Sequence, residues 1–292
     1  FTPNRRGRMN IQWFPGHMMK TQRMMQDNIK LIDIVIEIVD ARLPLSSRNP
    51  KIDEIVGDKP RLLLHNKADI ADAAITAQWE RYFSDNGVPV LVISSIGNKK
   101  LNFIFAKCRE ILADKIARQR ERGITNRAIK VIVVGVPNVG KSSLINKLSG
   151  RKSAITGDRP GVTKGKQWIR LENGIELLDT PGILWPKFED DSVGKKLAFT
   201  GAIKDEIMDI EELACELLVF LRSHYPESLD ERYRMTDIDG LEPYEMLTLL
   251  GKNRGFVVSG GEIDTERAAK ILLDEFRGAK LGNISLEKPD EF

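Results

Sequence analysis

The stretch "IKVIVVGVPNVGKSSLINKL" (129–148) decides the fold, because it joins three kinds of segment in one run. A β-branched apolar segment comes first and predicts a buried strand. A glycine-rich turn follows, and "KSSLINKL" then has the apolar spacing of a helix. From Gly135 to Ser142 the turn matches the pattern Gly-x-x-x-x-Gly-Lys-Ser/Thr. A strand, this loop and a helix in that order predict a phosphate-binding loop in an α/β protein.

Each part of this loop has a chemical role in holding phosphates. The glycines let backbone N–H groups close around a β-phosphate, and the helix that follows turns its positive end toward it. Lys141 would reach the β- and γ-phosphate oxygens, where it acts in catalysis, and the Ser142 hydroxyl would bind Mg²⁺. An unrelated glycine turn is the alternative. We expect nucleotide contacts from Asn138, Val139, Gly140, Lys141, Ser142 and Ser143.

A second motif, "HNKAD" (65–69), indicates which base the nucleotide carries. It follows an apolar segment that predicts a strand, and its last residue, Asp69, can accept hydrogen bonds from guanine N1–H and the exocyclic amine. Adenine offers no such pair, and an unpaired buried carboxylate would be costly. Asn66 would tie this segment to the phosphate loop. Lys67, with Ala68 beside it, would cover the base, although the same four residues taken alone also suit a polar turn.

Three further positions complete the expected nucleotide site. After the next predicted strand, Ser94 and Ser95 occupy the place of a segment whose backbone N–H contacts guanine O6. Asp179 begins "DTPG" at the end of another strand, where it would hold Mg²⁺ through water while the Gly182 N–H senses the γ-phosphate. Between them Thr163 would complete the Mg²⁺ coordination when GTP is bound, and we count it as catalytic.

The order of these motifs is unusual. The base-reading segment precedes the phosphate loop, so the usual order of a guanine-nucleotide-binding domain is cut open and rejoined. Strands alternate with helices as far as "GKQWIRL" (165–171) and "GIELLDTPG" (174–182), which predict an antiparallel pair in a mainly parallel sheet. A long helix is expected over 101–123. After residue 186 helix patterns alone remain.

We therefore expect an α/β fold, a circularly permuted P-loop GTPase domain followed by an all-α domain. Residues 1–8 resemble a leader introduced by cloning. The expected units are an N-terminal segment with "FPGHM" (9–21), the G domain (22–186) and a helical C-terminal domain that contacts RNA or the ribosome (187–292). Because the G domain would end at "DTPGI", a shift of Gly182 on hydrolysis would pass directly into the helices.

Composition places the chain among globular proteins of a reducing compartment. Of its 292 residues 41% are hydrophobic and 30% charged, and its net charge is only +3. Two distant cysteines form no disulfide or zinc pattern. The apolar segment 31–40 is interrupted by acidic residues, and the N-terminus lacks a secretory pattern, so we expect a cytoplasmic protein without a membrane partner.

Motif order and several longer stretches resemble the circularly permuted GTPases that serve ribosome assembly, and specifically the bacterial ribosome biogenesis GTPase A family, also called RbgA or YlqF. The stretches are "WFPGHMMK" (13–20), "DARLPLSSRNP" (40–50), "PNVGKSSLIN" (137–146) and "GDRPGVTKGKQW" (157–168). The resemblance covers the chain from Met9 onward. It implies GTP hydrolysis with Mg²⁺, and a role in maturation of the large ribosomal subunit.

The resemblance also bears on how GTP is hydrolysed. Many GTPases place a glutamine directly after "DxxG" to orient the attacking water, but Ile183 stands here. Slow turnover is therefore expected until another group is supplied. The family nominates His17, an acid/base residue at neutral pH, although His17 could instead pack at the start of a helix. Asn138 raises a second expectation, because related GTPases with this residue use K⁺ near the phosphates.

Basic runs at 115–130 and 151–170 suit contact with a polyanion, although a solvated surface is the alternative for the first. We expect GTP and GDP as ligands and a precursor of the large ribosomal subunit, with its rRNA and ribosomal proteins, as partner. A monomer is expected, without a sequence feature that fixes the oligomeric state. Two alternatives stay open: a regulatory GTPase outside the ribosome, and an RNA-binding protein whose G domain does not hydrolyse GTP.

Overall fold

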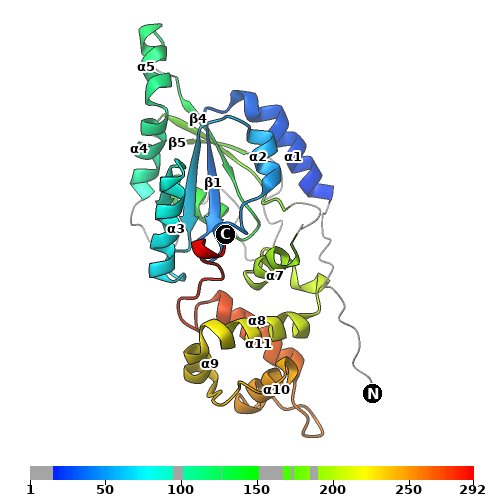
Figure 1. Ribbon diagram of the computed structural model, residues 1–292. Coiled ribbons are helices and arrows are strands. Elements are labelled where there is room, and N and C mark those ends of the chain that lie inside the picture. The colour runs from blue at the N-terminus through cyan, green and yellow to red at the C-terminus, as the bar shows by residue number, and fades with distance from the viewer. Residues whose placement is uncertain (1–15, 95–100, 126, 151–166, 172–173, 185–189) are drawn as a thin grey trace.

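The computed structural model describes residues 16–94, 101–125, 127–150, 167–171, 174–184 and 190–292 (Figure 1). For residues 17, 101, 102 and 167 only the backbone is described. The expected leader (1–8) and most of the N-terminal segment therefore lie outside the described part. The expected boundary at 186 falls in the undescribed stretch 185–189, and the division at that point stays a prediction.

One mixed sheet forms the centre of the G domain. Its strands are β1 (Ile34–Asp40), β2 (Arg61–Asn66), β3 (Val90–Val92), β4 (Ile129–Val134), β5 (Gln167–Leu171) and β6 (Ile175–Asp179). They lie in the order β3-β2-β1-β4-β6-β5. Every neighbouring pair is parallel except β5 and β6, which are antiparallel as predicted. The α/β fold with a mainly parallel sheet is confirmed.

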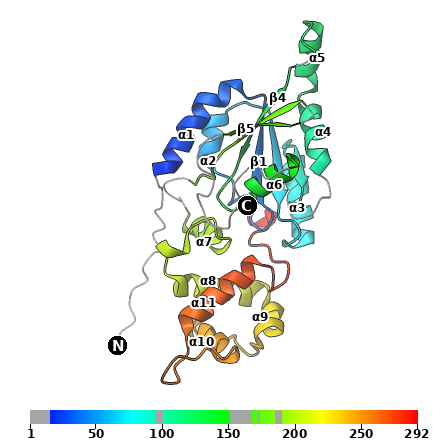
Figure 2. The same cartoon turned by 180° about the vertical axis from the view of Figure 1, so that it is seen from behind.

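Helices cover both sides of this sheet. Figures 1 and 2 show α1 (Gly16–Asn28) and α2 (Pro50–Val56) along one side, and α3 (Ala73–Asp85) and α4 (Leu101–Ile111) along the other. The helix α6 (Lys141–Leu148) follows β4. The single helix expected over 101–123 is wrong in detail. It is divided at Leu112 (φ −95°, ψ 9°), and α5 (Ala113–Glu121) continues beyond it with no buried residue.

Five helices follow in the described part of the C-terminal region. They are α7 (Asp191–Phe199), α8 (Ile210–His224), α9 (Pro226–Tyr233), α10 (Pro243–Asn253) and α11 (Thr265–Arg277). The short turns η1 (Ile29–Leu31), η2 (Asp205–Ile207) and η3 (Pro289–Glu291) are 3₁₀ helices. Figure 1 shows α7 between the sheet and the other four helices. A helical C-terminal portion was predicted, but α7 and α9 were not. Among the described residues no helix is both long and apolar enough to cross a membrane.

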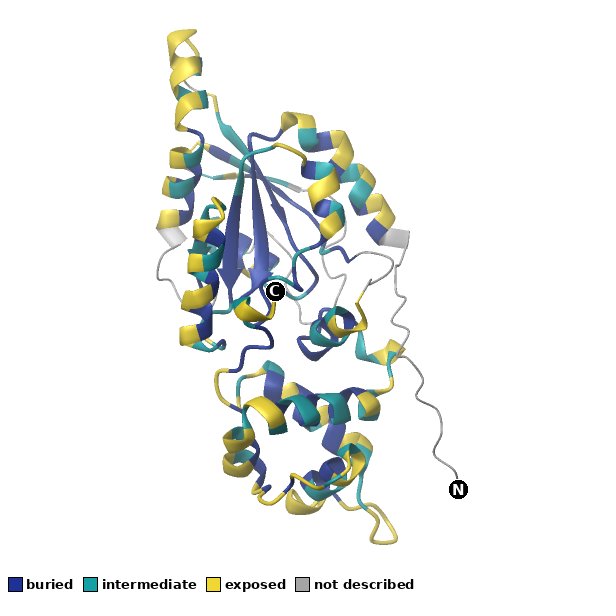
Figure 3. Ribbon diagram, viewed as in Figure 1, coloured by how far each residue is buried: buried dark blue, intermediate teal, exposed yellow. Residues whose placement is uncertain are grey.

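The core does not stop at the end of the G domain. One cluster of buried apolar side chains runs from the sheet, through Leu197 of α7, to Leu272 of α11. The chain also returns to the sheet at its end, where the C-terminus lies beside β1 and α3 (Figures 1 and 3). There the buried carboxylate of Glu287 accepts hydrogen bonds from the Ser46 N–H and hydroxyl at 3.0 and 2.7 Å. The helical portion is thus packed against the G domain at two places.

Candidate nucleotide site

The phosphate loop lies at the point where the sheet changes direction. Strands β1 to β3 extend to one side of β4, and β6 and β5 lie on the other. Ligands bind at such switch points, beyond the carboxyl ends of parallel strands. Gly135 (φ +155°) passes so close to β1 that a Cβ would lie 2.4 Å from the Ile38 carbonyl oxygen. Gly140 (φ +100°) then opens α6 in the left-handed region. Both glycines are required by the backbone path.

Lys141 points back over this loop. Its Nζ donates hydrogen bonds to the carbonyl oxygens of Gly135 (3.0 Å) and Val136 (2.8 Å), and the residue is buried. Burial lowers the pKa of Lys141 to about 8, against the opposing charge of Asp179. Carbonyl groups alone balance a buried ammonium only in part. A negatively charged phosphate would supply the missing charge at this place.

The segment "DTPG" lies directly against the phosphate loop. The Thr180 hydroxyl donates to the Val133 carbonyl oxygen at 2.7 Å and fixes the segment to β4. A Cβ on Gly182 would lie 2.7 Å from the Pro137 Cα and 2.8 Å from the Lys141 Nζ, so a glycine is needed for this approach. The structure thus brings together the loop and the segment expected to sense a γ-phosphate.

Asp179 provides an unusual carboxylate beside them. The residue is 1% exposed, and neither carboxylate oxygen has a hydrogen-bond partner within the described part of the chain. Burial raises the pKa of Asp179 to about 6, although the charge of Lys141 opposes the shift. Unpaired carboxylate oxygens are suitable ligands, directly or through water, for a hard cation such as Mg²⁺. The residues therefore fit the metal that the sequence predicts, with the Ser142 hydroxyl on the first turn of α6.

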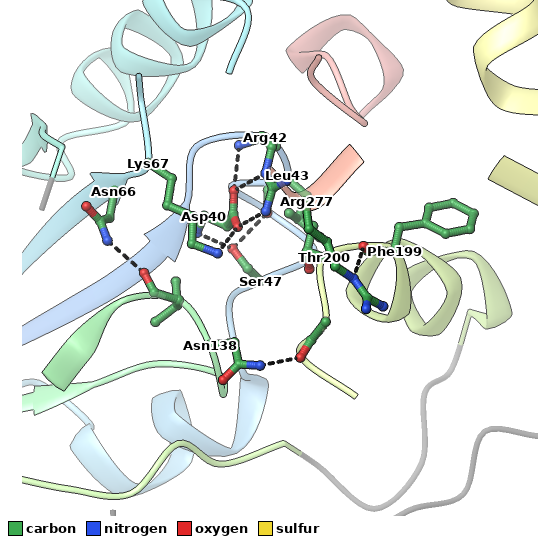
Figure 4. Close-up of polar contacts among 12 residues, drawn as sticks. Asp40, Arg42, Leu43, Ser47, Asn66, Lys67, Asn138, Phe199, Thr200 and Arg277 are labelled. Carbon is green, nitrogen blue, oxygen red and sulfur yellow. Dashed lines mark hydrogen bonds and ion pairs between the residues drawn. The ribbon is translucent and has the colours of Figure 1, made fainter. Parts of the chain in front are cut away.

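The base-reading segment is joined to the phosphate loop as expected. The Asn66 Nδ2 donates to the Val139 carbonyl oxygen at 2.7 Å (Figure 4). Ala68 donates its N–H to the Ile93 carbonyl oxygen at 3.2 Å, so the end of β2 lies next to the end of β3. Ser94 follows Ile93 in the chain, and Asp69, which follows Ala68, is exposed. The contact expected of Asn66 is present, whereas the guanine contacts stay a prediction.

Several predicted site residues cannot be placed. Ser95 and Thr163 lie outside the described residues, and so do most of the second basic run. His17 lies in the first turn of α1, but its side chain is not described. Ile183, in the place of the water-orienting glutamine, is 1% exposed and belongs to the apolar core. Its side chain therefore cannot act on a water molecule, in agreement with the sequence.

One charged cluster in the site was missed. Asp40, at the end of β1, accepts two hydrogen bonds from the Arg42 guanidinium at 2.9 and 2.8 Å, and the Lys67 Nζ lies 3.0 Å from it (Figure 4). Lys67 itself has φ +63°, which holds the base-reading segment in a left-handed turn. The signal was present, because Asp40 begins "DARLPLSSRNP", but that stretch had only supported the resemblance. In the same stretch, the Asn49 amide donates to the Ile183 carbonyl oxygen at 3.0 Å.

Comparisons with known proteins agree with this geometry. Residues 130–252 match the protein family described as "50S ribosome-binding GTPase". The chain is 51% identical over 284 residues to ribosome biogenesis GTPase A of Bacillus cereus, covering 97% of this chain and 96% of the relative. Identity to ribosome biogenesis GTPase A of Thermotoga maritima is 33%, with 96% and 95% covered.

Solved structures give the same result for the fold. The crystal structure of GNP-bound YlqF from T. maritima is 28% identical, with a TM-score of 0.65 over 93% of this chain and 99% of the other. The GDP-bound structure of the T. maritima protein has a TM-score of 0.63 at 28% identity, over 92% and 100%. The permuted G domain and the helical portion therefore occur together in solved structures.

Proposed function

The chain belongs to the ribosome biogenesis GTPase A family and is a GTPase, and we propose that it binds a precursor of the large ribosomal subunit in its GTP state. In this proposal it promotes a late maturation step in the cytoplasm and leaves after hydrolysis that the particle stimulates. The coarser role, ribosome assembly, follows from the family. The timing, the partner's state and the stimulation are the proposal.

The observation that carries the proposal is the burial of Ile183. Ile183 stands where many GTPases have a glutamine that orients water. Its side chain is apolar and 1% exposed in the core, so it cannot take over that role. Lys141 and Asp179, which would bind phosphate and Mg²⁺, are nevertheless both present and close enough to influence each other's pKa. Tight nucleotide binding with slow intrinsic chemistry is the behaviour expected of a GTPase that a partner activates.

We assign the nucleotide contacts on the same basis. The loop Asn138–Ser143 would hold the phosphates, Asn66–Asp69 the guanine, and Ser94 with Ser95 the guanine O6. Mg²⁺ would be bound by Ser142 and Thr163, and by Asp179 through water; when bound, it neutralises charge between the β- and γ-phosphates. The amide tie from Asn66 to Val139, at 2.7 Å, supports one nucleotide held by both segments. Asp69→Asn should exchange guanine for xanthine preference, since an amide can donate to the xanthine oxygen.

His17 is our candidate for the group that activates water. It lies in the first turn of α1, within the N-terminal segment that carries "FPGHM". Docking on a ribosomal particle would bring the side chain to the γ-phosphate. His17→Ala is then expected to leave GTP affinity unchanged and to abolish stimulated hydrolysis.

The decisive experiment measures phosphate release with and without purified large ribosomal subunits. A large increase with wild type, lost in His17→Ala, supports the proposal. No increase, combined with tight RNA binding, would favour an RNA-binding protein that does not hydrolyse GTP. Hydrolysis that ignores ribosomal particles would favour a regulatory GTPase outside the ribosome. Repeating the assay in K⁺ and Na⁺ at equal ionic strength tests whether K⁺ acts near Asn138.

A further inference from the structure

One side chain of the phosphate loop reaches the helical portion. The Asn138 Nδ2 donates a hydrogen bond to the Gly201 carbonyl oxygen at 2.7 Å, across 63 positions of sequence (Figure 4). Asn138 has φ +57°, in the left-handed region. Asparagine is one of the few residues other than glycine that adopt this conformation readily. A strained position of the loop is thus fastened to a point outside the G domain.

That point is the end of α7, and its geometry is fixed locally. Gly201 has φ +75° and donates its N–H to the Ala198 carbonyl oxygen at 2.9 Å. The Ala202 N–H donates to the Leu197 carbonyl oxygen at 3.0 Å. These two bonds form the Schellman arrangement that ends many helices at a left-handed glycine. It directs the Gly201 carbonyl away from α7, toward the phosphate loop.

Arg277, the last residue of α11, holds this helix end in place. Its guanidinium donates to the carbonyl oxygens of Phe199 (3.0 Å) and Ala198 (2.9 Å), and it forms a two-pronged ion pair with Asp205 at 2.7 Å for each contact. The last carbonyls of a helix have no partner within the helix and attract cations. A Cβ on Gly201 would lie 3.3 Å from the Arg277 Nε, so the guanidinium packs directly against this glycine.

We propose that Arg277 is a positioning residue for nucleotide binding. By fixing the end of α7, it fixes the Gly201 carbonyl, which in turn holds Asn138 and the phosphate loop in the conformation that binds phosphates. Without Arg277 the carbonyl is less confined and the loop populates more conformations. The nucleotide must then order the loop as it binds, and its affinity falls. The helical portion thereby becomes part of the nucleotide site.

A second contact places the same turn of α11 beside the base-reading side of the site. The ring of Phe276, next to Arg277, lies under the Arg42 guanidinium at 5.3 Å from the ring centroid. Arg42 is paired with Asp40, which also holds Lys67. The last turn of α11 therefore contacts residues that support both the phosphate loop and the base-reading segment. This is the position expected of an element that braces the site as a whole.

The test is a double-mutant cycle on GDP binding, measured by calorimetry on the full chain with Mg²⁺. Arg277→Ala should raise the Kd for GDP about three- to tenfold, the effect of one hydrogen bond. Asn138→Gly, which keeps the left-handed backbone but removes the amide, should raise it similarly. Because the two residues act through one contact, the double variant should bind no more weakly than the weaker single variant.

Arg254→Ala is the matched control, because Arg254 also anchors α11. Its guanidinium contacts Glu275 at 2.8 Å and lies over the Tyr233 ring, away from Gly201. This variant should lower the melting temperature and leave the Kd for GDP within about twofold. A Kd raised as much by Arg254→Ala, or additive effects in the cycle, would overturn the proposal. If Arg277→Ala does not fold, Arg277→Lys replaces it in the cycle, since lysine keeps the charge but lacks the fork.

Discussion

Two buried aspartates, one on each side of the strand that carries the phosphate loop, have opposite environments. Strand β4 pairs with β1 on one side and β6 on the other, and these strands end at Asp40 and Asp179. Both residues are almost fully buried, at 3% and 1% exposure. Both residues end a strand that pairs with β4, although Asp40 lies four positions further along the sheet, because Asp179 and Ile36 are both level with Val133. Their charged neighbours also differ.

Asp40 is surrounded by partners. Burial alone would raise its pKa, but the charges of Arg42 and Lys67 and the hydrogen bonds from Arg42 outweigh burial and hold the pKa well below its usual range. The Asp40 N–H is also bound, to the Ser47 hydroxyl at 3.0 Å. Both carboxylate oxygens thus accept hydrogen bonds from within the chain, as in a group that stabilises a loop.

The Asp179 carboxylate oxygens have no hydrogen-bond partner in the described part of the chain, and burial raises the pKa of Asp179 to about 6 although the charge of Lys141 opposes the shift. A buried carboxylate without a hydrogen-bond donor lowers the stability of the folded chain. Such a group persists where function requires it. The comparison supports a scaffold role for Asp40 and the proposed role of Asp179 in the ligand site.

The largest effect should come from breaking the paired side. Asp40→Asn leaves the buried guanidinium of Arg42, whose side chain is 2% exposed, without its carboxylate. Removing one partner of a buried pair costs about 3–5 kcal/mol of the free energy of unfolding. Urea denaturation without nucleotide measures this loss. A cost below about 1 kcal/mol would mean that the pair is screened by solvent and does not hold the loop.

Asp179→Asn should have the opposite profile. The variant removes a buried carboxylate that no donor binds, and the lost attraction to Lys141 offsets only part of that gain, so the free energy of unfolding without Mg²⁺ should stay the same or rise. The Mg²⁺ dependence of GTP hydrolysis should shift to about 10- to 100-fold higher concentration, as when a group that supports a metal through water is lost. Phosphate release across a Mg²⁺ titration measures the shift. Destabilisation similar to that of Asp40→Asn would end the distinction between the two aspartates.

The sequence predicted the unpaired aspartate and missed the paired one. Asp179 belongs to "DTPG", a local pattern whose chemistry is known from its placement after a strand. The partners of Asp40 are split between Arg42, two positions away, and Lys67, directly after the neighbouring strand β2. An ion pair between the ends of two strands depends on which strands are neighbours in the sheet, and the motif order predicted that only in outline. The base-reading tie from Asn66 was predictable because both of its ends lie in recognised motifs.

The contact from Asn138 to Gly201 was beyond the sequence for the same reason. Its acceptor is a backbone carbonyl at the end of α7, a helix that the helix patterns did not reveal. Every residue has a backbone carbonyl, so the sequence does not show which one accepts a hydrogen bond. Arg277, in contrast, lies in a helix that was predicted. Its proposed role depends on what packs against the last turn of that helix, which the sequence does not show. Local chemistry was therefore predictable, and the connections between the two portions were not.

Gly182→Ala tests the contact between "DTPG", which begins at Asp179, and the phosphate loop, which contains Lys141. The added Cβ would lie 2.7 Å from the Pro137 backbone, which cannot move as easily as a flexible side chain. Overpacking of this kind costs about 1–3 kcal/mol, as lost stability or as weaker binding of GDP. Gly240→Ala is the control, because nothing lies within 4 Å of its Cβ position. Equal behaviour of the two variants in denaturation and calorimetry would show that the loop adapts without cost.

The smallest expected effect is a pH dependence that only the unpaired aspartate produces. The pKa of Asp179 rises from its ordinary value of 3.8 to about 6 in the folded chain, so the folded state holds its proton more tightly than the unfolded state. The stabilisation from that proton is complete below pH 3.8 and is lost as the pH rises through about 6. Between pH 4 and 7, wild type should therefore lose about 2 kcal/mol relative to Asp179→Asn when both are unfolded in urea without Mg²⁺. Mg²⁺ with GDP should abolish the difference, because a cation beside the carboxylate favours its ionised form. A constant difference across this range would show that Asp179 is ionised throughout and already has a partner.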